Sequence, residues 1–293
     1  MYFIYLLNKK MYYSNHICMS KNNKCFDIAD EIFDEQEEDK YLIRQYVNSK
    51  FVKLIETQIK TSNNPYNKEK GHYTSIEFDD LYRNEIYDEV KKYLVKYLSS
   101  FIKEFTKKKK PSILIVGIGN EEYSPDALGP KVVKKVFPTS HLNSKDFKSK
   151  VSCIIPGVMG VTGLVSFTIV KGILNENKFD VIILVDALTT NSIFRLNHCI
   201  QITDTGLVPG SGVNNHRKAF NKESLNVPVI SIGIATVISL DSIYNELLNG
   251  LEIEKKIKVK KEKNLMLTIK EIEDRIEILT TLISDSLNMI LNP

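Results

Sequence analysis

The chain has 293 residues, of which 43% are hydrophobic, and this is enough to bury the core of one large domain. Its 40 basic and 36 acidic residues leave a net charge of +4, which is too small to indicate nucleic-acid binding. The four cysteines form no CxxC pair, so neither a zinc site nor a disulfide scaffold is expected. No run of eighteen apolar residues occurs, so we expect no membrane span. These features predict a globular, soluble protein of a reducing cytoplasm.

The first forty residues differ in composition from the rest of the chain. Residues 1–7 are apolar, but the stretch is too short to span a membrane, and no basic region precedes it as in a secretory signal. The residues that follow are polar and end in an acidic cluster at 34–39, which offers little apolar surface to bury. We predict a loosely held leader or propeptide-like segment over residues 1–40 and a single domain over residues 41–293.

Periodic apolar residues predict the elements of this domain. Helical spacing over residues 81–105 predicts one long amphipathic helix, and a second is expected at the C-terminus, after a capping box of Thr268 and Glu271. Ser124 and Thr162 are expected to cap two further helices. In chain order, the central elements are strand 113–118, helix 126–137, strand 151–155, helix 162–175 and strands 180–186, 199–203 and 228–234. This order predicts an α/β fold with three layers, αβα, and a mainly parallel sheet.

Two aspartates are expected where strands of this sheet end. Asp126 follows the first central strand, and Asp186 ends the apolar run 181–185, so both should lie at the carboxyl edge, where α/β proteins bind ligands. Two carboxylates that share one proton can serve as general base and general acid around an attacked carbonyl. The residues are equally compatible with structural roles, at a helix start and in a turn. Asp204 follows a later strand and is either a turn former or a third carboxylate of this edge.

Three glycine-rich loops are candidates for substrate binding and for backbone donors to an oxyanion. Their candidate residues are Gly119 and Asn120 in the first loop, Gly157 and Gly160 in the second, and Gly210, Ser211, Gly212 and Arg217 in the third. The first loop is not a dinucleotide fingerprint, because Glu122 stands where the third glycine would be. Ser211 lacks the GxSxG context of a serine nucleophile. The five histidines show no ligand spacing, so no metal or other cofactor is predicted.

Six segments in order resemble the germination protease family of aspartic-type peptidases over roughly residues 73–293. They are the segments at 115–120, 124–130, 155–163, 185–188, 201–206 and 209–213. The resemblance implies an endopeptidase that degrades small acid-soluble spore proteins during germination in the spore core. It also implies a zymogen, a homotetramer and a fold related to hydrogenase maturation proteases. Asp126 and Asp186 match the aspartates of the family's Pro-Asp-Ala-Leu-Gly-Pro and Asp-Ala-Leu motifs, and the resemblance assigns them as catalytic.

The leader contains a sequence similar to the sites that this family cleaves. The family cuts before a hydrophobic residue in motifs that resemble Glu-(Phe/Ile)-Ala-Ser-Glu, so we predict self-cleavage between Asp27 and Ile28. A coincidental amphipathic segment is the alternative. Two departures from the family pattern occur, namely Cys25-Phe26 in place of Arg-Thr and residues 235–239 in place of Pro-Thr-Val-Val-Asp. A metal-dependent maturation endopeptidase and a non-catalytic sporulation paralogue remain alternative functions.

Overall fold

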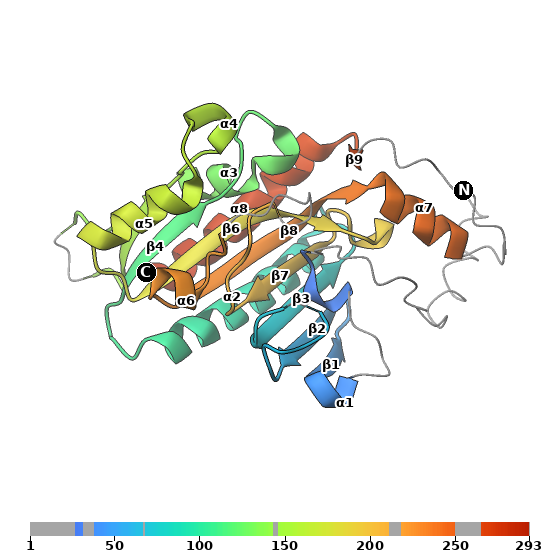
Figure 1. The fold of residues 1–293 in the computed structure, drawn as a ribbon, viewed down its shortest axis with the longest axis horizontal. Helices are drawn as coiled ribbons and strands as arrows, with labels where there is room; N and C mark the ends of the chain where they lie inside the picture. Colours follow the sequence, from blue (N-terminus) through green and yellow to red (C-terminus); the bar gives the residue numbers. More distant parts are fainter. Residues whose placement is uncertain are drawn as a thin grey trace.

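A computed structural model describes residues 27–31, 38–66, 68–142, 146–210, 218–249 and 265–292. Within these ranges the protein has a 9-stranded sheet in the order β1-β2-β3-β7-β8-β6-β4-β5, and β9 pairs with β8 (Figure 1). The strands are β1 (Leu42–Asn48), β2 (Val52–Ile59), β3 (Gly71–Phe78), β4 (Ser112–Gly117), β5 (Lys150–Ile154), β6 (Val181–Thr190), β7 (Cys199–Thr203), β8 (Val229–Ser239) and β9 (Met266–Leu267). The longer helices are α2 (Asn84–Phe105), α3 (Leu128–Lys135), α5 (Ser166–Glu176), α7 (Leu240–Asn249) and α8 (Ile272–Leu291). Single turns form α1 (Glu38–Tyr41), α4 (Met159–Thr162), α6 (Lys222–Leu225), η1 (Ala29–Glu31), η3 (Ser124–Asp126) and η4 (Ile193–Arg195).

The sheet is mixed, so the prediction of a mainly parallel sheet is wrong. Strands β5, β4, β6 and β8 run parallel, whereas β1, β2, β3 and β7 pair antiparallel with their neighbours. The connection between β6 and β7 explains part of this difference. It spans only residues 191–198 and holds one 3-10 turn, which is too short for the crossover that a parallel return requires. The sequence patterns do not predict the antiparallel strands over residues 42–78.

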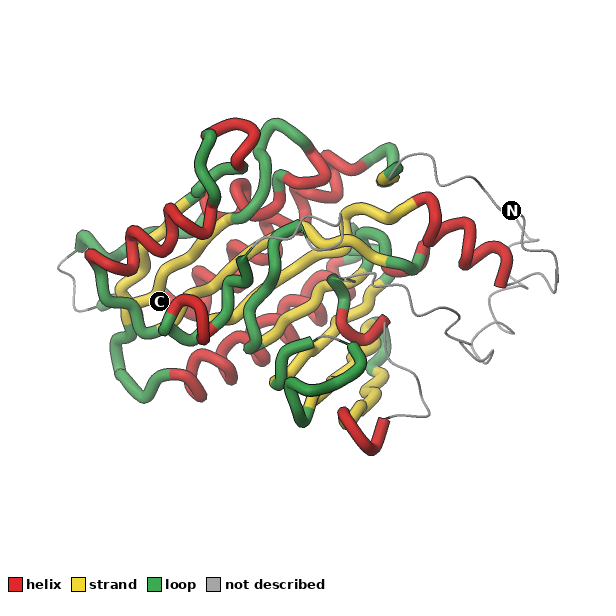
Figure 2. Tube along the Cα trace, in the orientation of Figure 1, coloured by secondary structure: helices red, strands yellow, loops and turns green. Residues whose placement is uncertain are grey.

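Helices cover both faces of the sheet, as a three-layer arrangement requires (Figure 2). Side chains alternate between the faces along each strand, and β6 shows the alternation clearly. Ile183 and Val185 belong to the core that α2, α3 and α8 cover. Ile182 and Leu184 belong to the core with Phe167 of α5 and Leu225 of α6. We call this second side the α5 face. By the same alternation the side chain of Asp186 belongs to the α5 face.

Most predicted elements exist, but their ends and caps differ. The long helices α2 and α8 are confirmed, and β6 and β8 extend several residues beyond their predicted ends. The predicted helix 162–175 is interrupted, because α4 ends at Thr162 and α5 begins at Ser166. The three predicted caps are wrong: Ser124 donates to Glu273, Thr162 to carbonyls of its own loop, and Thr268 to the Thr236 carbonyl in β8. Among the described helices, none is both long and apolar enough for a bilayer crossing.

Candidate active site

Asp186 lies on β6 in the interior of the sheet. Asp186 is only 5% exposed, and its Oδ1 accepts a hydrogen bond of 2.9 Å from the backbone N–H of Ala187. On the neighbouring strand β8 it is paired with Gly233. The strand does not end at this aspartate, as the sequence suggested, but continues to Thr190. Asp186 is therefore a buried carboxylate on the α5 face.

Asp126 is half-buried and ends the turn η3, between β4 and α3. Its Oδ2 accepts a hydrogen bond of 2.8 Å from the backbone N–H of Asn120. Gly119 makes this close approach feasible, because its φ of +124° suits glycine and a Cβ there would lie 2.0 Å from the Asp126 carbonyl oxygen. The Asn120 N–H, a predicted oxyanion donor, is thus bonded to Asp126 in this structure. The first glycine-rich loop holds the Asp126 carboxylate in place.

Both aspartates lie near the carboxyl end of β4. Gly117 of β4 is paired with Val185 of β6, and the next N–H, that of Ile118, donates to the Val185 carbonyl over 2.8 Å. The turn that carries Asp126 contacts both β6 and β8. The start of α3 is packed tightly here, since a Cβ on Gly129 would lie 2.4 Å from the Val185 carbonyl oxygen. The structure thus brings Asp126 to the strand that holds Asp186.

A substitution of Gly129 tests this close packing. We expect Gly129→Ala to lower the free energy of unfolding by about 3 kcal/mol, because its methyl group would meet backbone oxygens that cannot turn aside. Gly172→Ala is the matched control, since Gly172 lies mid-helix in α5 with nothing within 4 Å of its Cβ position. The control should be about 1 kcal/mol more stable than the unchanged chain. Urea unfolding compares the two, and equal stability would contradict the packing argument.

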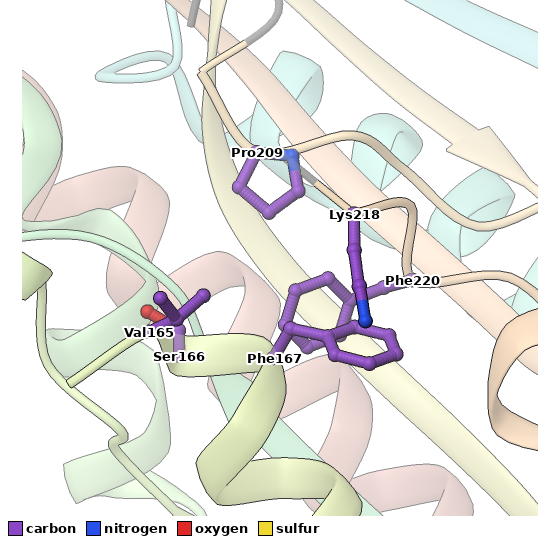
Figure 3. Close-up of a pocket in the computed structure, with 6 residues that line it drawn as sticks. All are labelled: Val165, Ser166, Phe167, Pro209, Lys218 and Phe220. Atoms are coloured by element: carbon purple, nitrogen blue, oxygen red, sulfur yellow. The ribbon is translucent and has the colours of Figure 1, made fainter. Parts of the chain in front are cut away.

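The second glycine-rich loop leads into α5, and residues that flank the third loop lie beside the start of this helix. The second loop leaves β5 at the same edge as Asp186, and the Gly157 carbonyl accepts from Ser166 over 2.7 Å. Gly160 lies in α4 and is exposed. Figure 3 shows a pocket between the start of α5 and the residues that flank the third loop, in which Lys218 lies over the ring of Phe167, 5.6 Å from its centre. The lining residues are Val165, Ser166, Phe167, Pro209, Lys218 and Phe220. Gly210 follows Pro209, whereas Ser211, Gly212 and Arg217 lie outside the described residues.

Asp204 is not a third carboxylate of this edge. Because β7 is antiparallel to β8, the residue after β7 lies at the opposite edge of the parallel strands. There its Oδ1 accepts from the backbone N–H of His72 over 2.7 Å, and its Oδ2 lies 2.8 Å from the ring Nδ1 of the same histidine. These contacts are consistent with a structural role for Asp204. In the described ranges no three His, Cys, Asp or Glu residues are grouped as metal ligands would be.

Residues 27–31, which contain the predicted self-cleavage site, are packed on the sheet. Ile28 is fully buried against Leu188, Cys199 and Ala235. The Oδ2 of Asp27 accepts from the Thr189 N–H over 2.9 Å. These contacts hold the five residues on the sheet. Figure 1 shows their turn η1, in dark blue, beside β3 and β7. The division of the chain at residue 40 stays a prediction.

Arg195 of η4 holds the acidic end of this segment. It pairs with Asp30 over 2.5 Å, with Glu77 of β3 over 2.5 Å and with Glu31 over 3.6 Å. Burial raises the pKa of Glu31 to about 7, against the opposing effect of Arg195. Burial also acts to raise the pKa of Asp30, but Arg195 and the Ser75 hydroxyl together hold it below its ordinary value. No sequence pattern had singled out Arg195.

The raised pKa of Glu31 predicts a pH-dependent stability. Below about pH 4.5 the Glu31 side chain is protonated in both the folded and the unfolded chain. Between about pH 4.5 and pH 7 only the unfolded chain releases this proton. The stability contributed by Glu31 should therefore decrease as the pH rises through this window, by an amount on the order of 3 kcal/mol. Denaturant titrations of the unchanged chain and Glu31→Gln should show their difference in unfolding free energy changing by this amount. Glu85→Gln, at an exposed site on α2, is the control and should show a flat difference.

The fold and its acidic edge define an α/β protein with a carboxylate-based candidate site. The sequence profile of the germination protease family matches residues 19–254. Germination proteases of Bacillus cereus and Bacillus anthracis are each 42% identical to the chain over 190 residues, and that of Bacillus cytotoxicus is 41% identical. Each alignment covers 62% of this chain and 52% of the relative, so the chain spans about half the length of these relatives. The chain belongs to the germination protease family.

Proposed function

We propose that the chain is an endopeptidase that initiates the degradation of small acid-soluble spore proteins during germination. The observation that carries the proposal is the packing of the turn with Asp126 against β6, the strand of Asp186, in a chain of the germination protease family. The relatives named above are described as germination proteases. Because the chain spans only about half of their length, its activity and its substrates are proposals.

The proposed chemistry is acid–base hydrolysis by the aspartate pair. One carboxylate removes a proton from an attacking water while the other, protonated, donates to the peptide carbonyl or the leaving amine. The unequal surroundings of the pair support such a division, since Asp186 is buried and Asp126 is half-buried. The second glycine-rich loop, with Gly157 and Gly160, leaves the same edge and would offer backbone donors to the developing oxyanion.

The remaining properties implied by the family are proposals as well. We infer a zymogen that cuts itself between Asp27 and Ile28, a homotetramer and a location in the spore core. The firm binding of residues 27–31 to the sheet supports the zymogen, because a segment that covers the surface near Asp186 would hinder a substrate there. No cofactor is part of the proposed mechanism.

A cleavage assay with the full chain tests the proposal. The purified chain is incubated with a small acid-soluble spore protein, and mass spectrometry identifies the fragments and the N-terminus of the chain itself. We expect cuts before hydrophobic residues in acidic sequences and a new N-terminus at Ile28. Loss of activity on addition of a chelator would favour a metal-dependent maturation endopeptidase instead. A spore protein left intact under every activating condition would support a non-catalytic paralogue.

A further inference from the structure

Residues 27–31 lie on the α5 face as a short peptide bound to the sheet. Two neighbouring rows of side chains, each running across four strands, underlie the segment. The first row holds Asp186, Gly233, Gln201 and Ser75. In the second, Leu188 is paired with Ala235 and Cys199 with Glu77, and Ala235 packs with Cys199. Ile28 packs on the second row, and Asp30 accepts a hydrogen bond of 2.6 Å from Ser75 in the first. The rows are one pleat repeat apart, about 7 Å, so the segment lies beside the Asp186 row.

The acidic side chains of the segment make most of its polar contacts. Asp30 bonds to Arg195 and to Ser75. Glu31 accepts from the hydroxyl of Thr190 and, over 2.8 Å, from the backbone N–H of Asn191. The side chains of Asp30 and Glu31 are only 3% and 5% exposed, so both carboxylates have been removed from water. A buried carboxylate is stable only with such charged and hydrogen-bonding partners. Arg195 and Ser75 keep the pKa of Asp30 low, whereas the partners of Glu31 do not compensate for its burial. The surface is therefore selective for an acid at the position of Asp30.

We propose that Arg195 is a specificity-determining residue that binds an acidic side chain at the third position after the cleaved bond. In the uncut chain Asp30 fills this subsite, 2.5 Å from Arg195, so the segment is a competitor that the chain carries itself. A substrate with an acid at this position would make the same contacts once the segment has left. The cleaved bond is that between Asp27 and Ile28, so this inference rests on the proposed function.

Cutting of that bond would itself weaken the binding of the segment. Hydrolysis adds one water, leaving a carboxylate on Asp27 and an ammonium group on Ile28. Ile28 is fully buried among apolar side chains, where a charged amine without a partner is costly. After the cut, the hydrogen bond between Asp27 and Thr189 no longer holds the residues that follow Asp27. Residues 28–31 should therefore leave the surface after the cut and open the subsite.

A peptide-binding experiment tests the subsite without requiring catalysis. A labelled peptide with the sequence of residues 27–36 is titrated into the full chain that carries Asp30→Asn and Glu31→Gln, whose own segment competes weakly. It should bind at least tenfold more tightly than to the unchanged chain. A second peptide, with Asn in place of the acid that corresponds to Asp30, should bind tenfold to a hundredfold more weakly, as expected for lost charge-assisted hydrogen bonds. Equal binding of the two peptides would overturn the proposal.

Substitutions of Arg195 in the same double variant show which residue selects the acid. Arg195→Met should make the two peptides bind equally, Arg195→Lys should reduce the selectivity, and Arg83→Met at an exposed site should leave it unchanged. Selectivity that survives in a folded Arg195→Met chain would overturn the assignment. If the Arg195→Met variant does not fold, the comparison of the two peptides and the Arg195→Lys variant still test the proposal. Acid-selective binding without any cleavage would refute only the proposed protease, whereas cleavage indifferent to the acid at the third position would refute only the subsite.

Discussion

Asp126→Asn and Asp186→Asn should each slow the cleavage of a spore-protein substrate by roughly a thousandfold, the scale of general acid–base catalysis. An amide of nearly the same shape can neither remove a proton from water nor deliver one to the leaving amine. The effect should fall on kcat, because neither variant alters a residue that contacts Asp30 or Glu31. Rates are measured by chromatography of the products, with circular dichroism as the test of folding.

A matched control separates catalysis from general acidity. Asp88 is exposed on α2, and Asp88→Asn should cleave at the rate of the unchanged chain. Asp186→Asn should lose about 1 kcal/mol of stability at most, since the Ala187 N–H keeps an oxygen acceptor. Full activity in either Asp126→Asn or Asp186→Asn would remove that residue from the mechanism, and unfolding of the variant would show a structural role instead.

The candidate site was predictable where it depends on local sequence. The apolar runs that became β4 and β6 are buried on both faces, and such strands are recognisable from composition alone. Because neighbouring parallel strands end at one edge, placing Asp126 and Asp186 together required only these two strands and the loop between β4 and α3. The position of Gly119 beside Asp126 follows from the same loop.

Strand direction and hydrogen-bond partners were not predictable, because they depend on distant residues. Thr268 stands in a capping-box sequence, but its hydroxyl donates to the carbonyl of Thr236, a strand residue that the tertiary fold brings next to it. Residues 27–31 have the composition of a loose leader and are nevertheless buried, since Ile28 finds an apolar site formed by three strands. Local propensity gives no information on such pairings.

Arg195 illustrates the same limit at the site. Its carboxylate partners are Asp30, Glu31 and Glu77, which lie more than a hundred residues away in the chain and on two separate elements. No motif contains Arg195 together with any of them. The only signal is electrostatic, because an acidic pair that becomes buried requires a cation, and η4 supplies one.

Arg195→Met should lower the free energy of unfolding of the full chain by about 3–5 kcal/mol, the cost of leaving buried carboxylates without their cation. The guanidinium is only 14% exposed and pairs with three acids, so neither solvent nor another residue replaces it. Adding Asp30→Asn and Glu31→Gln to Arg195→Met should restore part of the lost stability, because neutral amides cost less to bury without a cation. Arg83→Met, at an exposed site, should change stability by less than about 0.5 kcal/mol. Urea unfolding of the four chains measures these differences. A triple variant that is less stable than Arg195→Met would show that the acids stabilise the segment by some contact other than that with Arg195.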